Sequence, residues 1–122
     1  MGCDIHAYIE YDDYGDGKYD MWAKLHLNRH YLLFSVLADV RNNGEIEPVS
    51  APKGLPGNLS LGVADEYENR ADGHSESFLR LAEVGEALDR IKKTKYGSVD
   101  LEIIYEIMKR LENSRLVFWF DS

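Results

Sequence analysis

The chain has 122 residues, a formal net charge of −8 and a single cysteine. This length supports one hydrophobic core, so we expect residues 1–122 to form a single domain. One cysteine excludes an intramolecular disulfide and a cysteine-rich zinc site. The 22 acidic against 14 basic side chains argue against general nucleic-acid binding. No segment approaches the ~20 apolar residues that span a bilayer and no signal peptide is evident, so we expect a cytoplasmic protein without a membrane partner.

Residues 2–11 alternate between apolar and polar side chains, which is typical of a β-strand with one buried face. The apolar positions are Cys3, Ile5, Ala7 and Ile9, and the polar positions are Asp4, His6, Tyr8 and Glu10. The second set either forms an ordinary solvent-facing surface or places carboxylate, imidazole and phenol groups around one ligand.

The rest of the chain predicts further strands and several helices. Residues 19–27 alternate as a second strand, and Asn28 is a suitable N-cap for a helix over residues 29–41. Residues 45–58 hold all three prolines and lack a clear period. Ser60 is predicted to cap a short helix that extends to about residue 68.

The C-terminal half contains two helical patterns between two strand-like segments. Residues 78–81 read as a short strand, and helices are expected over residues 82–93 and after the N-cap residue Ser98. Residues 115–121 form a nearly continuous apolar run, as in a central strand that is buried on both faces. The pattern predicts an α+β fold. Its small, mainly antiparallel sheet includes the N- and C-terminal strands and packs on helices that lie on one side.

Unusual polar residues occur in three segments: Asp4 with His6, residues 28–31, and residues 72–77. Gly73 permits a tight turn that would present His74 and Ser75 at a sheet edge. Hydroxyl groups and arginine guanidinium groups both bind anions, the latter in a bidentate fork. The predicted site has His6 and His74 as catalytic residues, with ligand contacts from Asp4, Tyr8, Arg29, Arg41, Asp72, Ser75 and Ser77.

The sequence resembles a widespread family of small bacteriophage and prophage proteins. The resemblance begins with Met-Gly-Cys-Asp-Ile-His at residues 1–6. It continues through residues 31–34, 40–41, 54–56, 72–79 and 117–121. The family usually has an Asn-Tyr pair where this chain has His30-Tyr31, and often a longer insertion after the first strand. The resemblance implies a phage origin, and the protein would then act in the cytoplasm of an infected bacterial host. It also implies that the family shares one site, but it does not define the chemistry of that site.

Three functional hypotheses follow. In the first, the predicted site binds a nucleotide-type ligand, such as a signal made by a bacterial defence system. Two histidines could also cleave it as a metal-independent phosphodiesterase, with one acting as base and one as acid. In the second, Asp4, His6, Asp72 and His74 hold a divalent metal in a hydrolase, although no cofactor is favoured. In the third, an acidic surface inhibits a host nucleic-acid-binding protein. Homo-oligomerisation is left open.

Overall fold

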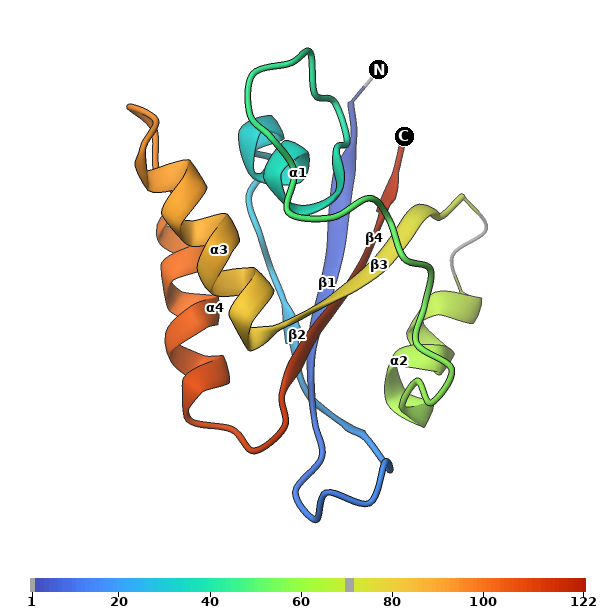
Figure 1. Cartoon of the computed structure of the whole chain (residues 1–122). Helices are drawn as coiled ribbons and strands as arrows, with labels where there is room; N and C mark the ends of the chain where they lie inside the picture. Colours follow the sequence, from blue (N-terminus) through green and yellow to red (C-terminus); the bar gives the residue numbers. More distant parts are fainter. Residues whose placement is uncertain (1, 70–71) are drawn as a thin grey trace.

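The structure is a computed structural model that describes residues 2–69 and 72–122. Its elements, in chain order, are β1 (Asp4–Tyr11), β2 (Asp20–Leu25), α1 (Tyr31–Ala38), α2 (Leu61–Glu68), β3 (His74–Arg80), α3 (Leu81–Lys92), α4 (Val99–Lys109) and β4 (Arg115–Asp121) (Figure 1). The strands form one antiparallel sheet in the order β2-β1-β4-β3. The α+β class and the pairing of the first and last strands are therefore confirmed. In the described part of the chain, no helix is long and apolar enough to cross a membrane.

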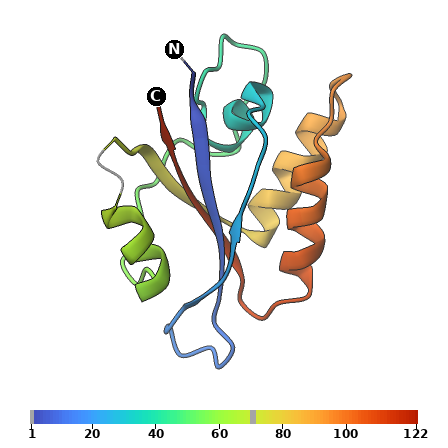
Figure 2. The ribbon, with the colours of Figure 1, turned by 180° about the vertical axis from the view of Figure 1, so that it is seen from behind.

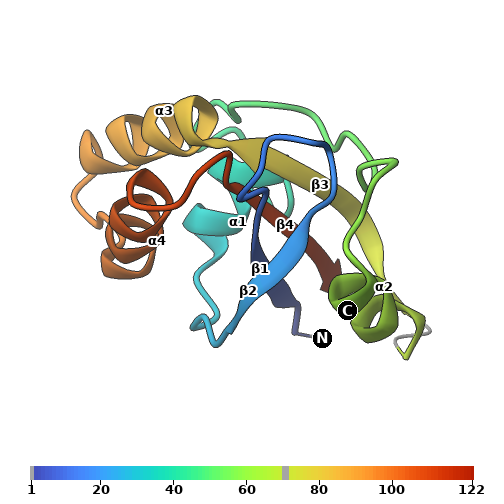
Figure 3. The same cartoon turned by 90° about the horizontal axis from the view of Figure 1, so that it is seen from below.

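Helices cover both faces of the sheet, which corrects the expectation that they lie on one side. Figure 3 shows α1, α3 and α4 on one face and α2 on the other. We call these the three-helix face and the α2 face. The larger apolar core lies on the three-helix face, and a smaller cluster that includes Val63 and Trp119 lies on the α2 face.

The central strand β4 is buried on both faces, as its apolar run predicts. Leu116, Phe118 and Phe120 belong to the core of the three-helix face, whereas Val117 and Trp119 belong to the cluster beneath α2. All five side chains are 0% exposed. A strand without a solvated face therefore sits at the centre of the sheet, where neighbours on both sides satisfy its backbone groups.

The apolar half of β1 is buried as predicted, but its polar half is only partly exposed. Tyr8 and Glu10 are 0% exposed, because α2 and the segment before it cover the end of the strand. The Glu10 carboxylate accepts from the Ser60 amide at 2.7 Å and from Arg115 Nε at 2.6 Å. The solvated part of this strand face is therefore confined to Asp4 and His6.

Several element boundaries differ from the predictions. Helix α1 starts at Tyr31 with His30 at the N-cap, and it ends before Asp39, whose φ of 59° is left-handed. Strand β3 begins at His74, four residues before the predicted 78–81 strand, and has an irregularity where Ser75 has a φ of 55°. The predicted caps at Ser60 and Ser98 are confirmed by hydrogen bonds from backbone amides to their hydroxyl oxygens.

Candidate functional site

The strand register places the two predicted catalytic histidines on opposite faces of the sheet. His6 pairs with Trp119 and His74 pairs with Phe120. Because consecutive residues of β4 point to opposite faces, so do their partners. Each imidazole stacks on its own partner, with ring centroids 6.0 Å apart for His6–Trp119 and 6.2 Å apart for His74–Phe120. The prediction that these two histidines line one cavity is wrong.

Most of the remaining predicted ligand contacts also lie away from His6. Ser77 is buried opposite Phe118 on the three-helix face, and its hydroxyl oxygen accepts from the Lys53 amide at 3.0 Å. The Ser75 hydroxyl lies 3.0 Å from Nδ1 of His74. Arg41 lies over the Tyr31 ring of α1, 5.2 Å from its centroid. Asp72 is exposed before β3 begins.

A different set of polar residues converges in a groove between β1 and β2. The register pairs Tyr8 with Lys24 and Ala7 with Leu25, and its continuation places His26 opposite His6. Side chains at opposed positions of antiparallel strands have Cβ atoms ~5 Å apart. The groove has a volume of about 310 Å³. Its polar lining residues are Asp4, His6, Tyr8, Lys24 and His26.

The imidazole of His6 is held on two sides. Its ring stacks on Trp119 at an interplanar angle of 25°, and its Nε2 hydrogen-bonds the Asp121 carboxylate. Because a carboxylate only accepts, Nε2 carries a proton, so in the neutral form of the ring Nδ1 is the accepting nitrogen. Nδ1 has no hydrogen-bond partner among residues 2–69 and 72–122. This arrangement suits a proton acceptor whose tautomer is set by a neighbouring acid.

Cationic side chains stand at both ends of the groove, each paired with a carboxylate. Lys24 Nζ lies 2.6 Å from Glu66 Oε1 of α2, and the Tyr8 hydroxyl donates to the same oxygen at 3.3 Å. At the other end, Arg29 Nη2 lies 2.8 Å from Asp4 Oδ1. The hydrogen bond to Asp4 raises the pKa of Arg29 above its ordinary value.

Gly2 allows Arg29 to reach its position. A Cβ atom on Gly2 would lie 2.1 Å from Arg29 Nη1, far inside van der Waals contact, so a larger residue would displace the guanidinium. The predicted contacts Asp4, His6, Tyr8 and Arg29 are thus brought together, and the second residue of the chain contributes to this by lacking a side chain.

Sequence reasoning missed Lys24 and His26. Both lie on the outward face of the predicted second strand, where an exposed polar side chain is ordinary and does not by itself indicate a site. The signal that identifies them is the hairpin register, since even-numbered residues near the end of β2 face even-numbered residues of β1. The length of the connecting loop decides that register.

The alternative metal set of Asp4, His6, Asp72 and His74 does not form one site, because His6 and His74 are separated by the sheet. Among the residues that the structure describes, no group of three or more His, Cys, Asp and Glu side chains is arranged to hold a metal ion. We therefore assign no ligand set for a divalent metal.

Comparisons with models of protein families, with curated proteins and with solved structures find no match to this chain.

Proposed function

We propose that the groove between β1 and β2 binds a nucleotide-type ligand through a phosphate group. The observation that carries this proposal is the convergence of His6, His26 and Lys24 on one groove. Imidazolium and ammonium groups donate hydrogen bonds to phosphate oxygens and balance their charge. A volume of about 310 Å³ lies at the lower end of small-molecule sites, which suits part of a nucleotide.

Local charge supports an anionic ligand despite the net charge of −8. The ion pairs of Lys24 with Glu66 and of Arg29 with Asp4 are 30–54% exposed at their side chains. Exposed pairs of this kind contribute little to stability, because water screens the two charges. A phosphate group can therefore replace Glu66 as the partner of Lys24, or Asp4 as the partner of Arg29, with little loss of stability. A ligand that does both contacts both cations.

The same groups can catalyse phosphodiester cleavage without a metal. His6, oriented by Asp121, accepts a proton from the attacking hydroxyl through Nδ1. His26 donates a proton to the leaving oxygen from the opposite wall, and Lys24 stabilises the charge that develops on the phosphate. His6 keeps the catalytic role predicted from the sequence, whereas His26 takes the place assigned to His74.

The resemblance to phage proteins supplies the proposed setting. A phage protein that binds or cleaves nucleotides in the host cytoplasm would remove signals made by bacterial defence systems. Both the family resemblance and the chemistry of the groove support this role. A groove that does not bind nucleotides would refute it.

The test is to incubate cyclic and linear nucleotides with the wild-type protein and with the His6→Ala, His26→Ala and Lys24→Ala variants, and to resolve the products by chromatography. If cleavage occurs, removing either imidazole should lower the rate ~10²–10⁴-fold, the usual effect of one acid–base group. The rate should also pass through a maximum with pH, because one imidazole must be neutral and the other charged.

Two further variants serve as comparisons. His30→Ala, at the start of α1, should leave binding and turnover unchanged. His74→Ala should do the same if the groove is the site, and a loss as large as that in His6→Ala would contradict the assignment to His26. Nucleotides that remain both unbound and unchanged with the wild-type protein would refute the proposed function. They would favour an acidic inhibitor of a host protein instead.

A further inference from the structure

The groove between β1 and β2 offers hydrogen-bond acceptors as well as cations. Figure 2 shows the two strands side by side, β1 in dark blue and β2 in lighter blue. Lys24 stands at one end of the groove, opposite Tyr8. Toward the other end, Nδ1 of neutral His6 accepts, and Asp4 Oδ1 accepts from Arg29 Nε at 3.0 Å. Asp4 Oδ2 has no hydrogen-bond partner among the residues that the structure describes.

These acceptors suit a ligand that carries a hydroxyl group beside its phosphate. Asp4 and His6 are two positions apart on β1, so their backbones are separated by ~7 Å along the strand. A carboxylate repels a phosphate group, whereas a sugar hydroxyl donates a hydrogen bond to it. A ribonucleotide has a hydroxyl group at C2′, next to the 3′-phosphate, and a deoxyribonucleotide lacks it.

The two imidazoles of the groove approach a bound phosphate from opposite walls. His6 belongs to β1, and the continued register places His26 opposite it, just after β2 ends at Leu25. Both histidines line the groove. In phosphoryl transfer the attacking and leaving oxygens lie roughly in line, on opposite sides of the phosphorus. A base on one wall and an acid on the other wall match this geometry.

A 2′-hydroxyl is the nucleophile that this arrangement favours. A general base must lie within hydrogen-bond reach of the proton that it removes. Because the 2′-hydroxyl and the 3′-phosphate share one sugar, binding of the phosphate also positions the nucleophile. Well-oriented intramolecular nucleophiles reach effective concentrations of ~10⁵–10⁸ M. A water molecule lacks this covalent connection and needs separate contacts to hold it.

We infer that the substrate is a 3′–5′ linked ribonucleotide and that its own 2′-hydroxyl attacks the phosphorus. This inference rests on the proposed function. The 2′-oxygen bonds to phosphorus, and its proton moves to His6 Nδ1. The bond from phosphorus to the 5′-oxygen breaks, and that oxygen takes a proton from His26. The products are a 2′,3′-cyclic phosphate and a 5′-hydroxyl.

The step consumes no co-reactant, because His6 gains one proton and His26 loses one. The positive charge that His6 gains lies beside Asp121, whose carboxylate already accepts from Nε2. Exchange of protons with solvent restores both histidines before the next turnover.

The test compares a 3′–5′ diribonucleotide with the same dinucleotide that carries hydrogen in place of the 2′-hydroxyl. Calorimetry on the wild-type protein should give dissociation constants within roughly tenfold of each other, since the two ligands differ by one hydroxyl. Only the ribonucleotide should be cleaved. Phosphorus NMR should show the 2′,3′-cyclic phosphate as the first product.

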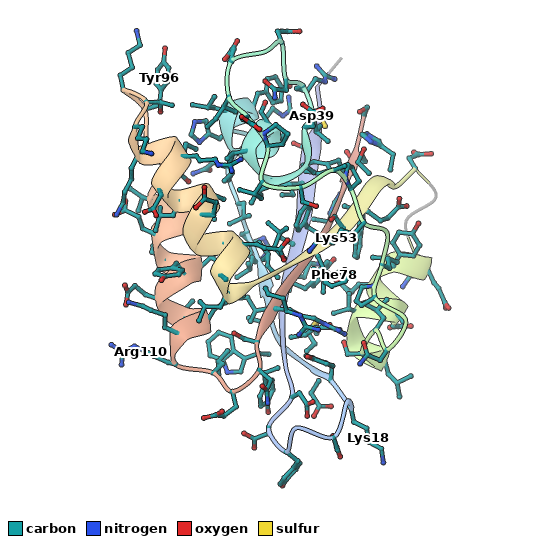
Figure 4. The ribbon with its side chains drawn as sticks, viewed as in Figure 1. Lys18, Asp39, Lys53, Phe78, Tyr96 and Arg110 are labelled. Carbon is teal, nitrogen blue, oxygen red and sulfur yellow. The ribbon has the colours of Figure 1, made fainter. Side chains whose placement is uncertain are left out.

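A ribonucleoside 3′-(4-nitrophenyl phosphate) separates the roles of the two histidines, because nitrophenolate leaves without a proton. His26→Ala should lose ~10²–10⁴-fold in rate on the diribonucleotide but stay within about tenfold of the wild type on this substrate. His6→Ala should lose on both. Lys18→Ala is the control for Lys24→Ala, since Lys18 projects from the β1–β2 loop (Figure 4). It should leave both rates unchanged.

The outcomes separate this inference from the proposed function. Cleavage of the deoxy dinucleotide at a comparable rate, or binding of both dinucleotides without cleavage, overturns the inference and leaves nucleotide binding intact. An equal loss of His26→Ala on both substrates also overturns it, as does full activity in His6→Ala. If neither dinucleotide binds, the proposed function itself is refuted.

Discussion

On the α2 face, the protonation of the Tyr67 hydroxyl is linked to the stability of the fold. The Tyr67 hydroxyl of α2 donates to the Glu76 carboxylate of β3, and the Tyr67 ring lies edge-on to Trp119 with centroids 4.9 Å apart. The hydrogen bond to Glu76, partial burial and the negative charge of Glu76 all raise the pKa of Tyr67 above its ordinary value of 10.0. Neutral Tyr67 therefore attaches α2 to the sheet.

We predict that the stabilisation from this hydroxyl is lost at alkaline pH. Because the pKa is higher in the folded than in the unfolded state, the stabilisation is complete below pH ~10 and declines as pH rises through the folded value. Tyr67→Phe should lower the free energy of unfolding by ~1 kcal/mol at neutral pH, with the difference shrinking above pH ~10. Urea denaturation of the wild-type protein and of Tyr67→Phe, from neutral to alkaline pH, measures this difference.

Tyr105→Phe is the matched control, because Tyr105 is a partly buried tyrosine whose hydroxyl has no hydrogen-bond partner among the described residues. Its difference from the wild-type protein should not depend on pH. A Tyr67→Phe difference that stays constant from neutral to strongly alkaline pH would contradict the linkage.

At the scale of elements, one buried ion pair joins four parts of the chain. Arg115 of β4 contacts Glu10 of β1, donates to Asn58 Oδ1 at 2.8 Å, and lies 3.5 Å from the centroid of the Tyr19 ring. Glu10 in turn accepts from the Ser60 amide at the start of α2. The side chains of Glu10 and Arg115 are 0% and 1% exposed. The pair therefore fixes where the segment before α2 meets the sheet.

We predict that Arg115→Met lowers the free energy of unfolding by about 3–5 kcal/mol, because it leaves the Glu10 carboxylate buried without its cation. The double variant Glu10→Gln/Arg115→Met should recover part of this loss, since no charge is then left unpaired. Chemical denaturation measures both. Lys109→Met, which breaks an exposed pair with Glu106, should leave the free energy of unfolding nearly unchanged, because water screens such a pair. Equal losses in the buried and exposed cases would refute this account.

For the whole molecule, β4 is the element on which the sheet depends. It pairs with β1 on one side and β3 on the other, and it contributes side chains to the cores on both faces. Without it, β3 loses its partner strand and α3 and α2 lose the surface against which they pack.

We predict that a chain ending at Asn113 shows no cooperative unfolding transition. Five side chains that are fully buried in β4 stabilise the fold by ~1.5–3 kcal/mol each, which together is comparable to the whole stability of a domain, ~5–15 kcal/mol. Deletion of Ser122 alone, which removes a hydrogen bond to His74, should leave a cooperative transition. Thermal melting followed by circular dichroism distinguishes the two chains. A cooperative melt of the truncated chain would contradict the prediction.

Patterns within short segments of the sequence predicted the α+β class, the caps at Ser60 and Ser98, the buried face of β1 and the burial of β4. These features depend on side-chain periodicity and on local hydrogen bonds, which neighbouring residues determine. The sequence also identified three residues that line the groove, Asp4, His6 and Tyr8, and Arg29, which pairs with Asp4.

Tertiary structure alone decided which histidines can act together. His6 and His74 have similar chemistry, but the face on which each lies depends on strand register, and a shift of one residue reverses it. That register arises from the loop before β2 and from the irregularity at Ser75. The burial of Glu10 with Arg115 likewise required α2 to cross the second face. Local periodicity carries no information about contacts between segments far apart in the chain, so it could not predict these features.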